Sequence, residues 1–544
     1  MKPEAAKRQI RAIKGVRDIL PPESALWNRV EQTARDVFAT YGYGEIRLPI
    51  FEETELFARS VGSETDIVSK EMYSFFDPDR DLEDLVEGYI SSVRGKGFSP
   101  NILEQYVGAG FALLQWFSTR DPDTLTGKPR ELALALREKA SRQFSETTLD
   151  EIPEIISAFQ KPMLQYHREF RNAISVAVSL RPEATASVCR AYIEHGMHTL
   201  PGDVKLYYIG PMFRRERPQK GRYRQFYQIG AEVLGQSDAP AIDAEVIEML
   251  MAFFHRVGLT GCKLHLNSIG CRDCRPNYVE KLREALLKVK GQLGSDSQRR
   301  IETNPLRVLD SKLPEEQPII EKLPRIGEHL CPACREHFAA LQEQLKLRSI
   351  AYEINWRLVR GLDYYMRTTF EIIAPGLGAQ NAVCGGGRYD GLVELLGGPA
   401  TKGIGFAIGT DRVVLSLFTP DEDFWLPPRP QPPAQVVKPF TDDDVLPAAP
   451  VLDVLIAWMG AAAYPTAVKL ARRLRGEGLS VELPAEEMKL KKSLGLADKL
   501  GARYAIIIGE NEVASGRFTV KRLVDAQQRE LGEAELIEFL RSKP

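Results

Sequence analysis

The side chains best suited to bind an anion lie in residues 205–224, KLYYIGPMFRRERPQKGRYR, which we call the arginine-rich arm. It carries seven Lys and Arg residues against the single Glu216. Arg214 ends an apolar stretch, and Arg222 stands where the chain turns back toward FYQIG. Guanidinium groups there can bind phosphate oxygens through paired hydrogen bonds, which lysine cannot form. The alternative is a solvated loop, because runs of charge usually face water.

Polar residues on both sides of the arm could hold a bound cation. Gln228 and Glu232 are four residues apart on a predicted strand, so their side chains share one face. Upstream, LRPEAT places Glu183 and Thr185 at alternate positions. A carboxylate and an amide beside arginines can bind an ammonium group, with Glu183 as a second anion. The alternative is that these are ordinary polar residues on an exposed strand.

Two later segments add residues suited to a pocket. LVRGLDYY puts Arg360 before a glycine and Tyr364 and Tyr365 after it, a combination that can line a pocket for a small ring. GIGFAIGTDRVVL predicts a strand that ends near Arg412, in the first turn of a helix. Between them, VCGGGRYDGLVELLG predicts a tight glycine turn that leads into a helix, because consecutive glycines permit positive φ or close backbone approach.

Four of the seven cysteines form two CxxC pairs, Cys271 with Cys274 and Cys331 with Cys334. Two such pairs can complete a tetrahedral zinc site if the fold brings them together. In a reducing compartment this spacing favours metal over disulfide. The alternative is four free thiols.

Length and composition limit the class of protein. The chain has 544 residues, 44% hydrophobic and 27% charged, which is typical of several globular units. A net charge of -2 excludes attraction of the whole molecule to a polyanion, so any nucleic-acid contact must depend on local patches. No stretch approaches the ~20 apolar residues of a membrane span, and the N-terminus lacks the apolar run of a secretory signal. We therefore expect a cytoplasmic protein.

The expected elements predict an α+β fold. Apolar residues at helical spacing predict a helix over 23–41, and EIRLPIF predicts a short strand that Pro49 limits to an edge or an end. Two β-rich runs flank the arginine-rich arm and predict an antiparallel pair. Strands outnumber parallel crossover units, which favours an antiparallel sheet with helices on one side over a Rossmann sheet.

The chain is expected to divide into a main domain over 1–420, a proline-rich linker over 421–450 and a small α/β domain over 451–544. The apolar spacing in residues 80–172 predicts a mainly helical insertion within the main domain. With 12 Lys and Arg against 14 Asp and Glu, this insertion is not a basic clamp. The sequence assigns it no role.

Taken together and in this order, the motifs resemble the class II aminoacyl-tRNA synthetases, specifically the histidyl-tRNA synthetase family. MFRRERPQKGRYRQFYQIGAEV is similar to the class's second motif, LVRGLDYY to a histidine-specific motif, and EIRLPIF to the first motif, a dimer interface. LRPEAT, GGGRYDG and GIGFAIGTDR are similar to the remaining elements. The resemblance covers residues 10–79, 173–415 and 451–544.

The resemblance implies an antiparallel-sheet catalytic domain, a C-terminal anticodon-binding domain and a homodimer. It implies ATP-dependent ligation of L-histidine to tRNA(His) through histidyl-adenylate, with Mg²⁺ accompanying ATP. Any zinc would be structural. Arg360 and Arg214 would be the catalytic residues. The implied ATP-binding residues are Arg214, Glu216, Arg222 and Arg412, and the implied histidine-binding residues are Glu183, Thr185, Arg214, Gln228, Glu232, Arg360, Tyr364 and Tyr365.

The chain departs from the family pattern at three positions. Ala184 replaces a glycine in the LRPEGT-like motif, Asp411 stands where glutamate is commoner, and Thr410 is atypical. None of these changes removes a charged group. An alternative is a non-catalytic paralogue that binds histidine and regulates its biosynthesis, but such proteins typically lack the anticodon module and some phosphate-binding arginines. A domain that senses uncharged tRNA would usually be fused to a kinase, and the chain shows no kinase motif.

Overall fold

The computed structural model describes residues 10–62, 65, 67–76, 177–216, 218–219, 221–375, 377, 381–417 and 452–541. The predicted insertion over 80–172 and the predicted linker over 421–450 lie outside these described residues. The chain divides into a large unit made of Met1–Ile50, Leu56–Met72 and Arg181–Pro544, and a small unit made of Phe51–Glu55 and Tyr73–Leu180.

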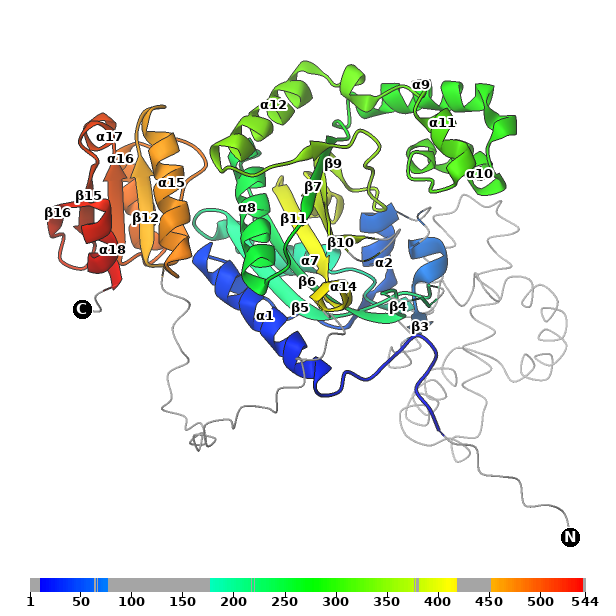
Figure 1. Ribbon diagram of the computed structural model, residues 1–544, viewed down its shortest axis with the longest axis horizontal. Coiled ribbons are helices and arrows are strands. Elements are labelled where there is room, and N and C mark those ends of the chain that lie inside the picture. Colours follow the sequence, from blue (N-terminus) through cyan, green and yellow to red (C-terminus); the bar gives the residue numbers. More distant parts are fainter. Residues whose placement is uncertain are drawn as a thin grey trace, which may run out of the picture. The chain divides into compact units, whose positions relative to one another are not determined.

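The large unit contains an eight-stranded sheet in the order β1-β5-β6-β11-β10-β9-β7-β8 (Figure 1). Its strands are β1 Gly44–Glu45, β5 Val204–Phe213, β6 Gln225–Gly235, β7 Lys263–Ser268, β8 Glu353–Ile354, β9 Met366–Ile373, β10 Ala382–Arg388 and β11 Lys402–Gly409. The six central strands pair antiparallel, and only the short edge strands β1 and β8 pair in parallel. The predicted α+β class with an antiparallel sheet is confirmed.

Four helices bury the apolar residues of this sheet. They are α1 Glu23–Thr40, α8 Pro240–Val257, α12 Pro332–Leu347 and α14 Thr410–Leu417, and α8 contacts both α1 and α12 (Figure 1). The predicted helix over 23–41 is α1, whose apolar side includes the fully buried Val30 and Phe38. The Phe38 ring lies 5.5 Å from Tyr207 and 5.9 Å from Phe406, so this helix joins the core that supports the central strands.

Six further helices lie before residue 418 in the described part of the chain. They are α2 Thr54–Phe57, α7 Thr185–Glu194, α9 Arg275–Lys288, α10 Ser295–Thr303, α11 Gln317–Ile320 and α13 Leu392–Leu395. Single π turns lie at Ala58–Gly62 and Ile67–Glu71, and 3-10 turns at Met197–Thr199, Lys290–Gln292, Pro305–Val308, Pro314–Glu316 and Ile326–His329.

The prediction of one strand over EIRLPIF was wrong. Only Gly44–Glu45 and Phe51–Glu53 form strands, and the residues between them do not. Pro49 has no N–H to donate to a ladder. The carbonyls of Leu48 and Pro49 instead accept hydrogen bonds from Arg181 Nη1, at 3.0 and 3.1 Å. The guanidinium therefore takes the place of a neighbouring strand.

The prediction of a tight turn at the three glycines of VCGGGRYDG was also wrong, although a turn at Asp390–Gly391 does lead into helix α13. All three glycines lie inside β10, paired with β9 on one side and β11 on the other. Without a Cβ, these glycines allow neighbouring groups to lie close against the strand backbone. A Cβ on Gly385 would collide with the Arg360 guanidinium, and one on Gly386 would collide with the carbonyl of Gly405.

The C-terminal part of the large unit has its own five-stranded sheet, in the order β13-β12-β14-β15-β16. Its strands are β12 Val454–Trp458, β13 Val481–Glu482, β14 Tyr504–Ile508, β15 Arg517–Arg522 and β16 Gln528–Gly532, and its helices are α15 Ala463–Gly476, α16 Leu490–Lys499, α17 Glu510–Ser515 and α18 Glu533–Arg541. The first three strands are parallel, as strand and helix alternate along the chain, and β15 and β16 add an antiparallel hairpin.

The small unit contains a three-stranded antiparallel sheet in the order β2-β4-β3, formed by β2 Phe51–Glu53, β4 Ala177–Leu180 and β3 Ser74–Phe76. The Ser179 hydroxyl lies 2.7 Å from that of Thr54 and 2.8 Å from that of Ser74. Across the described residues of the whole chain, no helix combines the length and the apolar character needed to cross a bilayer.

Candidate functional site

One cavity of about 290 Å³ gathers almost all of the predicted ATP- and histidine-site residues. They come from the start of α7, the end of β5, the arginine-rich arm, β6, the loop before β9 and the first turn of α14. Those that line it are Glu183, Thr185, Arg214, Glu216, Arg222, Gln228, Arg360, Tyr364, Tyr365 and Arg412. Glu232 does not line the cavity, but its carboxyl group is hydrogen-bonded to a residue that does. The roles of these residues stay predictions.

Three arginines converge at one end of the cavity. Arg214 Nε donates to the carbonyl of Pro182 at 2.9 Å, and its guanidinium lies 5.2 Å from the centre of the Phe226 ring. Glu216 lies between two of the arginines, 3.8 Å from Arg214 Nη1 and 3.3 Å from Arg222 Nη1. This carboxylate keeps the two guanidinium groups together in the absence of an anion.

Arg412 completes this cationic end. Its Nη1 donates to the carbonyl of Ala382 at 2.6 Å, and its Nε donates to that of Gly221 at 3.3 Å. Burial, together with repulsion from Arg222, lowers the pKa of Arg412 below its usual range. Guanidinium groups held this close together repel one another, and this favours binding of a polyanionic ligand between them.

Arg360 enters the cavity from the loop before β9. Its Nη1 donates to Glu371 Oε1 at 3.0 Å, while its buried Nε has no hydrogen-bond partner. Both residues line the cavity. The guanidinium passes over Gly385, where any side chain would block it. It is therefore fixed in direction and still has a donor to offer.

Two buried carboxyl groups lie on either side of Thr185, Glu183 in the cavity wall and Glu232 behind it. Glu183 accepts hydrogen bonds from the backbone N–H groups of Thr185 and Ala186, at 2.8 and 3.1 Å, and the Tyr364 hydroxyl lies 3.4 Å from its Oε2. Burial raises the pKa of Glu183 above its usual range. A carboxyl group that faces the cavity can balance the charge of a bound cation, which suits the predicted ammonium site.

Glu232 is fully enclosed behind Thr185. Its Oε1 accepts from the Thr185 hydroxyl at 2.7 Å, and its Oε2 accepts from the Tyr389 hydroxyl at 2.6 Å. Burial raises its pKa to about 8. Glycine at position 405 of the neighbouring strand leaves room for this carboxyl, since a Cβ there would collide with Glu232 Oε2.

Sequence reasoning missed Tyr389 and Arg17. Tyr389 follows directly on the glycine-rich strand, a position that could have marked it as a side chain pointing at the site. Arg17 donates to Glu23 at 2.8 Å and to Asp411 Oδ1 at 3.2 Å, and Asp411 Oδ2 accepts from the backbone N–H of Tyr227 at 3.1 Å. The atypical Asp411 thus ties the N-terminal segment to the cavity wall, and nothing in the spacing of Arg17 indicates this.

The other two departures lie at well-packed positions. Ala184 is completely buried at the N-cap of α7, so its methyl group has a place in the apolar cluster beside Val188. Thr410 is also completely buried, and its hydroxyl has no hydrogen-bond partner. Neither side chain lines the cavity.

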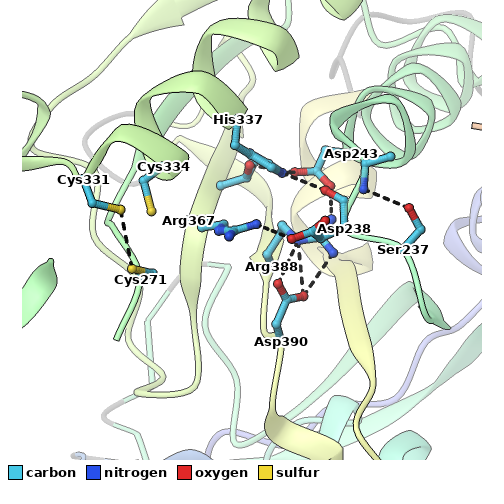
Figure 2. Close-up of polar contacts among 12 residues, drawn as sticks. Ser237, Asp238, Asp243, Cys271, Cys331, Cys334, His337, Arg367, Arg388 and Asp390 are labelled. Carbon is cyan, nitrogen blue, oxygen red and sulfur yellow. Dashed lines mark hydrogen bonds and ion pairs between the residues drawn. The ribbon is translucent and has the colours of Figure 1, made fainter. Parts of the chain in front are cut away.

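A buried charge network supports the sheet behind the cavity (Figure 2). The Arg388 guanidinium, completely buried, donates to Asp243 and lies 3.0 Å from Asp390. Asp243 also accepts from the Thr368 hydroxyl at 2.7 Å. Because Arg388 precedes Tyr389, this network fixes the strand that carries the Glu232 partner.

The network continues to helix α12. His337 Nε2 lies 3.0 Å from the carbonyl of Asp238 and 3.8 Å from Asp243 Oδ2. The Asp238 carboxylate pairs with Arg367 at 2.5 Å. Burial lowers the pKa of His337, so its ring is neutral at pH 7.

The four cysteines of the two CxxC pairs meet in one cluster, with all sulfur atoms within 4.8 Å of one another. Cys271 Sγ lies 3.7 Å from Cys274 Sγ and 3.8 Å from Cys331 Sγ, and Cys274 Sγ lies 3.9 Å from Cys334 Sγ. Four thiolates around a tetrahedral zinc at ~2.3 Å are separated by about 3.8 Å. The donor set and its spacing therefore fit zinc.

The sequence matches proteins of known name. Residues 172–413 match the family model described as histidyl-tRNA synthetase, and residues 453–543 match that of an anticodon binding domain. The histidine--tRNA ligase of Koribacter versatilis is 45% identical over 537 residues, 98% of this chain and 96% of its own. That of Solibacter usitatus is 45% identical over 528 residues, 97% of this chain and 98% of its own.

Solved structures carry the same family name. The apo histidyl-tRNA synthetase of S. aureus is 29% identical, covers 98% of this chain and 100% of its own, and overlays with a TM-score of 0.47. The family itself follows from the curated relatives, which share 45% of their residues with nearly the whole chain. The chain belongs to the histidyl-tRNA synthetase family.

Proposed function

We propose that the protein ligates L-histidine to tRNA(His), in two steps that pass through histidyl-adenylate and release pyrophosphate and AMP. The relatives that match almost the full length are named histidine--tRNA ligase. The observation that carries the proposal is a single cavity lined by Arg214, Arg360 and Arg412 together with Glu183 and Tyr364. Such a cavity suits a nucleotide and a cationic amino acid held side by side.

The arginine end would bind ATP. Arg214 would contact the α-phosphate, and Arg222 and Arg412 the distal phosphates or adenine. Glu216, which now pairs with Arg214 and Arg222, would exchange these contacts for the nucleotide. Magnesium bound with ATP would neutralise further phosphate charge, and the cavity carboxylates of Glu216 and Glu371 could hold it.

Activation needs little covalent chemistry from the protein. The histidine carboxylate attacks the α-phosphorus, and the bond to the pyrophosphate oxygen breaks. Arg360 and Arg214 would neutralise the charge that develops on the phosphoryl oxygens in this transition state. Placing both reactants in one cavity supplies the rest, so no enzyme nucleophile is required.

The part of the cavity beside Glu183 would bind histidine. Glu183, Thr185 and Gln228 would hold the ammonium group, with Glu232 directly behind Thr185, and the two tyrosines would line the space for the imidazole. Gln228 Oε1 is buried without a hydrogen-bond partner in the free protein, so it has an acceptor to offer. A site that hydrogen-bonds both ends of the amino acid would strongly reject analogues that lack these groups.

Histidine binding should release a proton from Glu232. Burial raises the pKa of Glu232 to about 8, so this carboxyl carries its proton at pH 7 in the free protein. An ammonium group bound nearby favours the carboxylate and lowers its pKa, so histidine affinity should rise with pH up to about 8 and then level off. Calorimetric titration in two buffers of different ionisation enthalpy measures the proton. Equal release by Glu232→Gln would contradict this prediction.

The proposed function is tested by histidine-dependent exchange of labelled pyrophosphate into ATP, followed by charging of a tRNA(His) transcript. We expect both reactions, with no exchange when histidine is omitted or replaced by alanine. A pure protein that binds histidine in calorimetry but shows no exchange would overturn the proposal and favour the regulatory paralogue. The residues that match an anticodon binding domain would contact the tRNA in the second step.

We further propose a cytoplasmic homodimer. Support for dimerisation comes from exposed apolar side chains in and beside the segment that resembles the first motif. Phe51 is 56% exposed and Phe75 is 45% exposed, with ring centres 6.4 Å apart. Light scattering should give twice the chain mass of 61.0 kDa. All seven cysteines are free, which suits a reducing compartment.

We propose that the cysteine cluster binds one structural zinc ion. Elemental analysis of protein purified without chelator should find one zinc per chain. Cys271→Ser combined with Cys331→Ser should remove it, because two of four thiolate ligands are lost. Cys262→Ser, a half-buried cysteine outside the cluster, should keep the metal. Purified protein without zinc would contradict the assignment.

A further inference from the structure

We propose that the four-cysteine centre positions the histidine-binding tyrosines, so that metal occupancy sets the affinity for histidine and leaves that for ATP unchanged. This inference rests on the proposed function and on the proposed zinc site. It goes beyond a purely structural zinc, because it connects the cysteine cluster to one substrate of the two.

The residues next to Cys271 and Cys274 hold the tyrosine segment through both backbone and side-chain hydrogen bonds. Arg275, directly after Cys274, donates from Nη1 to the carbonyl of Tyr365 at 2.5 Å. The carbonyl of Gly270, directly before Cys271, accepts from the N–H of Arg367 at 2.8 Å, and Ile269 N–H donates to the carbonyl of Arg367, also at 2.8 Å. Three hydrogen bonds thus fasten residues 365–367 to the segment that carries the first cysteine pair.

Side-chain packing follows the same path. Tyr365 belongs to the buried apolar cluster that contains Cys271, Cys274 and Cys334. Its ring lies 4.8 Å from that of Tyr364, whose hydroxyl lies 3.4 Å from Glu183 Oε2. Both tyrosines line the cavity. A shift of the cysteine cluster would therefore move the wall of the proposed histidine site.

Arg367 shows that the segment needs this support. Its φ is +49°, in the left-handed region that a residue with a side chain rarely adopts. Such a conformation persists only where surrounding contacts impose it. Here those contacts are the hydrogen bonds to Ile269 and Gly270 and the ion pair with Asp238. If residues 269–271 loosened, Arg367 could relax to negative φ and carry Tyr365 with it.

The second cysteine pair is connected to Arg367 through helix α12, His337 and Asp238 (Figure 2). Cys331 is the N-cap of α12, and Cys334 lies in its first turn. His337, one turn further, contacts the Asp238 carbonyl at 3.0 Å, and Asp238 pairs with Arg367. A metal ion that joins both cysteine pairs would therefore fix both anchors of Arg367 at once.

The arginine end has separate supports. Arg214 is held by Pro182 and Glu216, and Arg412 by Ala382 and Gly221. None of these contacts involves residues 269–275 or 331–337. The geometry therefore predicts a selective loss of histidine affinity rather than a general loss of both substrates.

The decisive variant is Arg275→Gln, which removes the hydrogen bond to Tyr365 and leaves all four thiols. Loss of a charged donor should raise the histidine KM in pyrophosphate exchange, and the histidine Kd in calorimetry, by about tenfold or more. The ATP KM should stay within about twofold, and the zinc content should stay at one per chain. The matched control is Arg283→Gln on the same helix, whose Nε contacts the carbonyl of Ile301 at 3.4 Å.

The metal itself is tested with the Cys271→Ser and Cys331→Ser double variant. It should show the same selective loss of histidine affinity, with its helical content checked by circular dichroism. If the double variant fails to fold, Arg275→Gln decides the question alone. Unchanged histidine affinity in zinc-loaded Arg275→Gln would overturn the inference, and so would an equal loss for ATP. If the wild-type protein shows no exchange, the proposed function fails, while calorimetry with histidine still tests this inference.

Discussion

Replacing Arg360 with alanine is expected to lower kcat for histidine-dependent pyrophosphate exchange by about 10²- to 10³-fold, the usual cost of losing one preorganised charged donor. The guanidinium is held by a hydrogen bond to Glu371 at 3.0 Å and passes over Gly385, so it cannot leave the cavity. Its buried Nε has no partner in the free protein. The charge is thus in place before the transition state forms.

The matched control for Arg360 is Arg357→Ala in the same loop. Arg357 contacts Gln317 at 2.6 Å and Glu321 at 3.2 Å, outside the cavity, so exchange should stay close to the wild-type rate. Arg360→Lys should recover only part of the rate, because an ammonium cannot keep the Glu371 contact and present a second donor in the same plane. A normal kcat with only a raised KM in Arg360→Ala would show that Arg360 binds ground states and not the transition state.

Much of the site could be predicted from sequence, because strands impose simple geometry. Residues Gln228 and Glu232, four apart on β6, do share one side of the strand, and the arginine-rich arm does contain the first of two antiparallel strands, β5, and lead into the second, β6. The two CxxC pairs also meet, as their spacing allowed. In each case a local pattern or a short motif carried the information.

The remaining parts depend on contacts between distant residues. Besides nearby acidic residues, Arg17 contacts Asp411, 394 positions away, and Arg388 contacts Asp243, 145 positions away. No periodicity marks such pairs. The glycines of β10 were predicted as a turn for the same reason. The side chain that leaves no room for a Cβ there is that of Arg360, which comes from another segment of the chain. The prediction of a strand around Pro49 was wrong because Arg181 donates hydrogen bonds to the carbonyls that a neighbouring strand would otherwise contact.

The second large effect is expected for Asp243→Ala, which should lower the free energy of unfolding by about 3 to 5 kcal/mol, as is typical when one member of a buried ion pair is removed. Asp243 and Arg388 are both completely buried. Without Asp243, the Arg388 guanidinium keeps only the Asp390 carboxylate, and the Thr368 hydroxyl loses its acceptor. A buried charge with fewer partners than donors is costly, because no water can replace the lost group.

Urea unfolding followed by tryptophan fluorescence measures this loss, since Trp27 is buried in the apolar core to which α8, the helix that carries Asp243, also contributes. The midpoint for Asp243→Ala should fall with little change in slope. Asp243→Asn keeps an acceptor for Arg388 at equal volume, so its loss should be smaller. The control is Asp296→Ala, whose carboxylate is 54% exposed beside Arg299 and Arg300 and should not matter, as exposed pairs contribute little. If Asp243→Ala unfolded at the wild-type midpoint, Asp390 alone would be sufficient to balance the charge of Arg388. The network behind the cavity would then contribute to the geometry of the cavity without contributing to the stability of the protein.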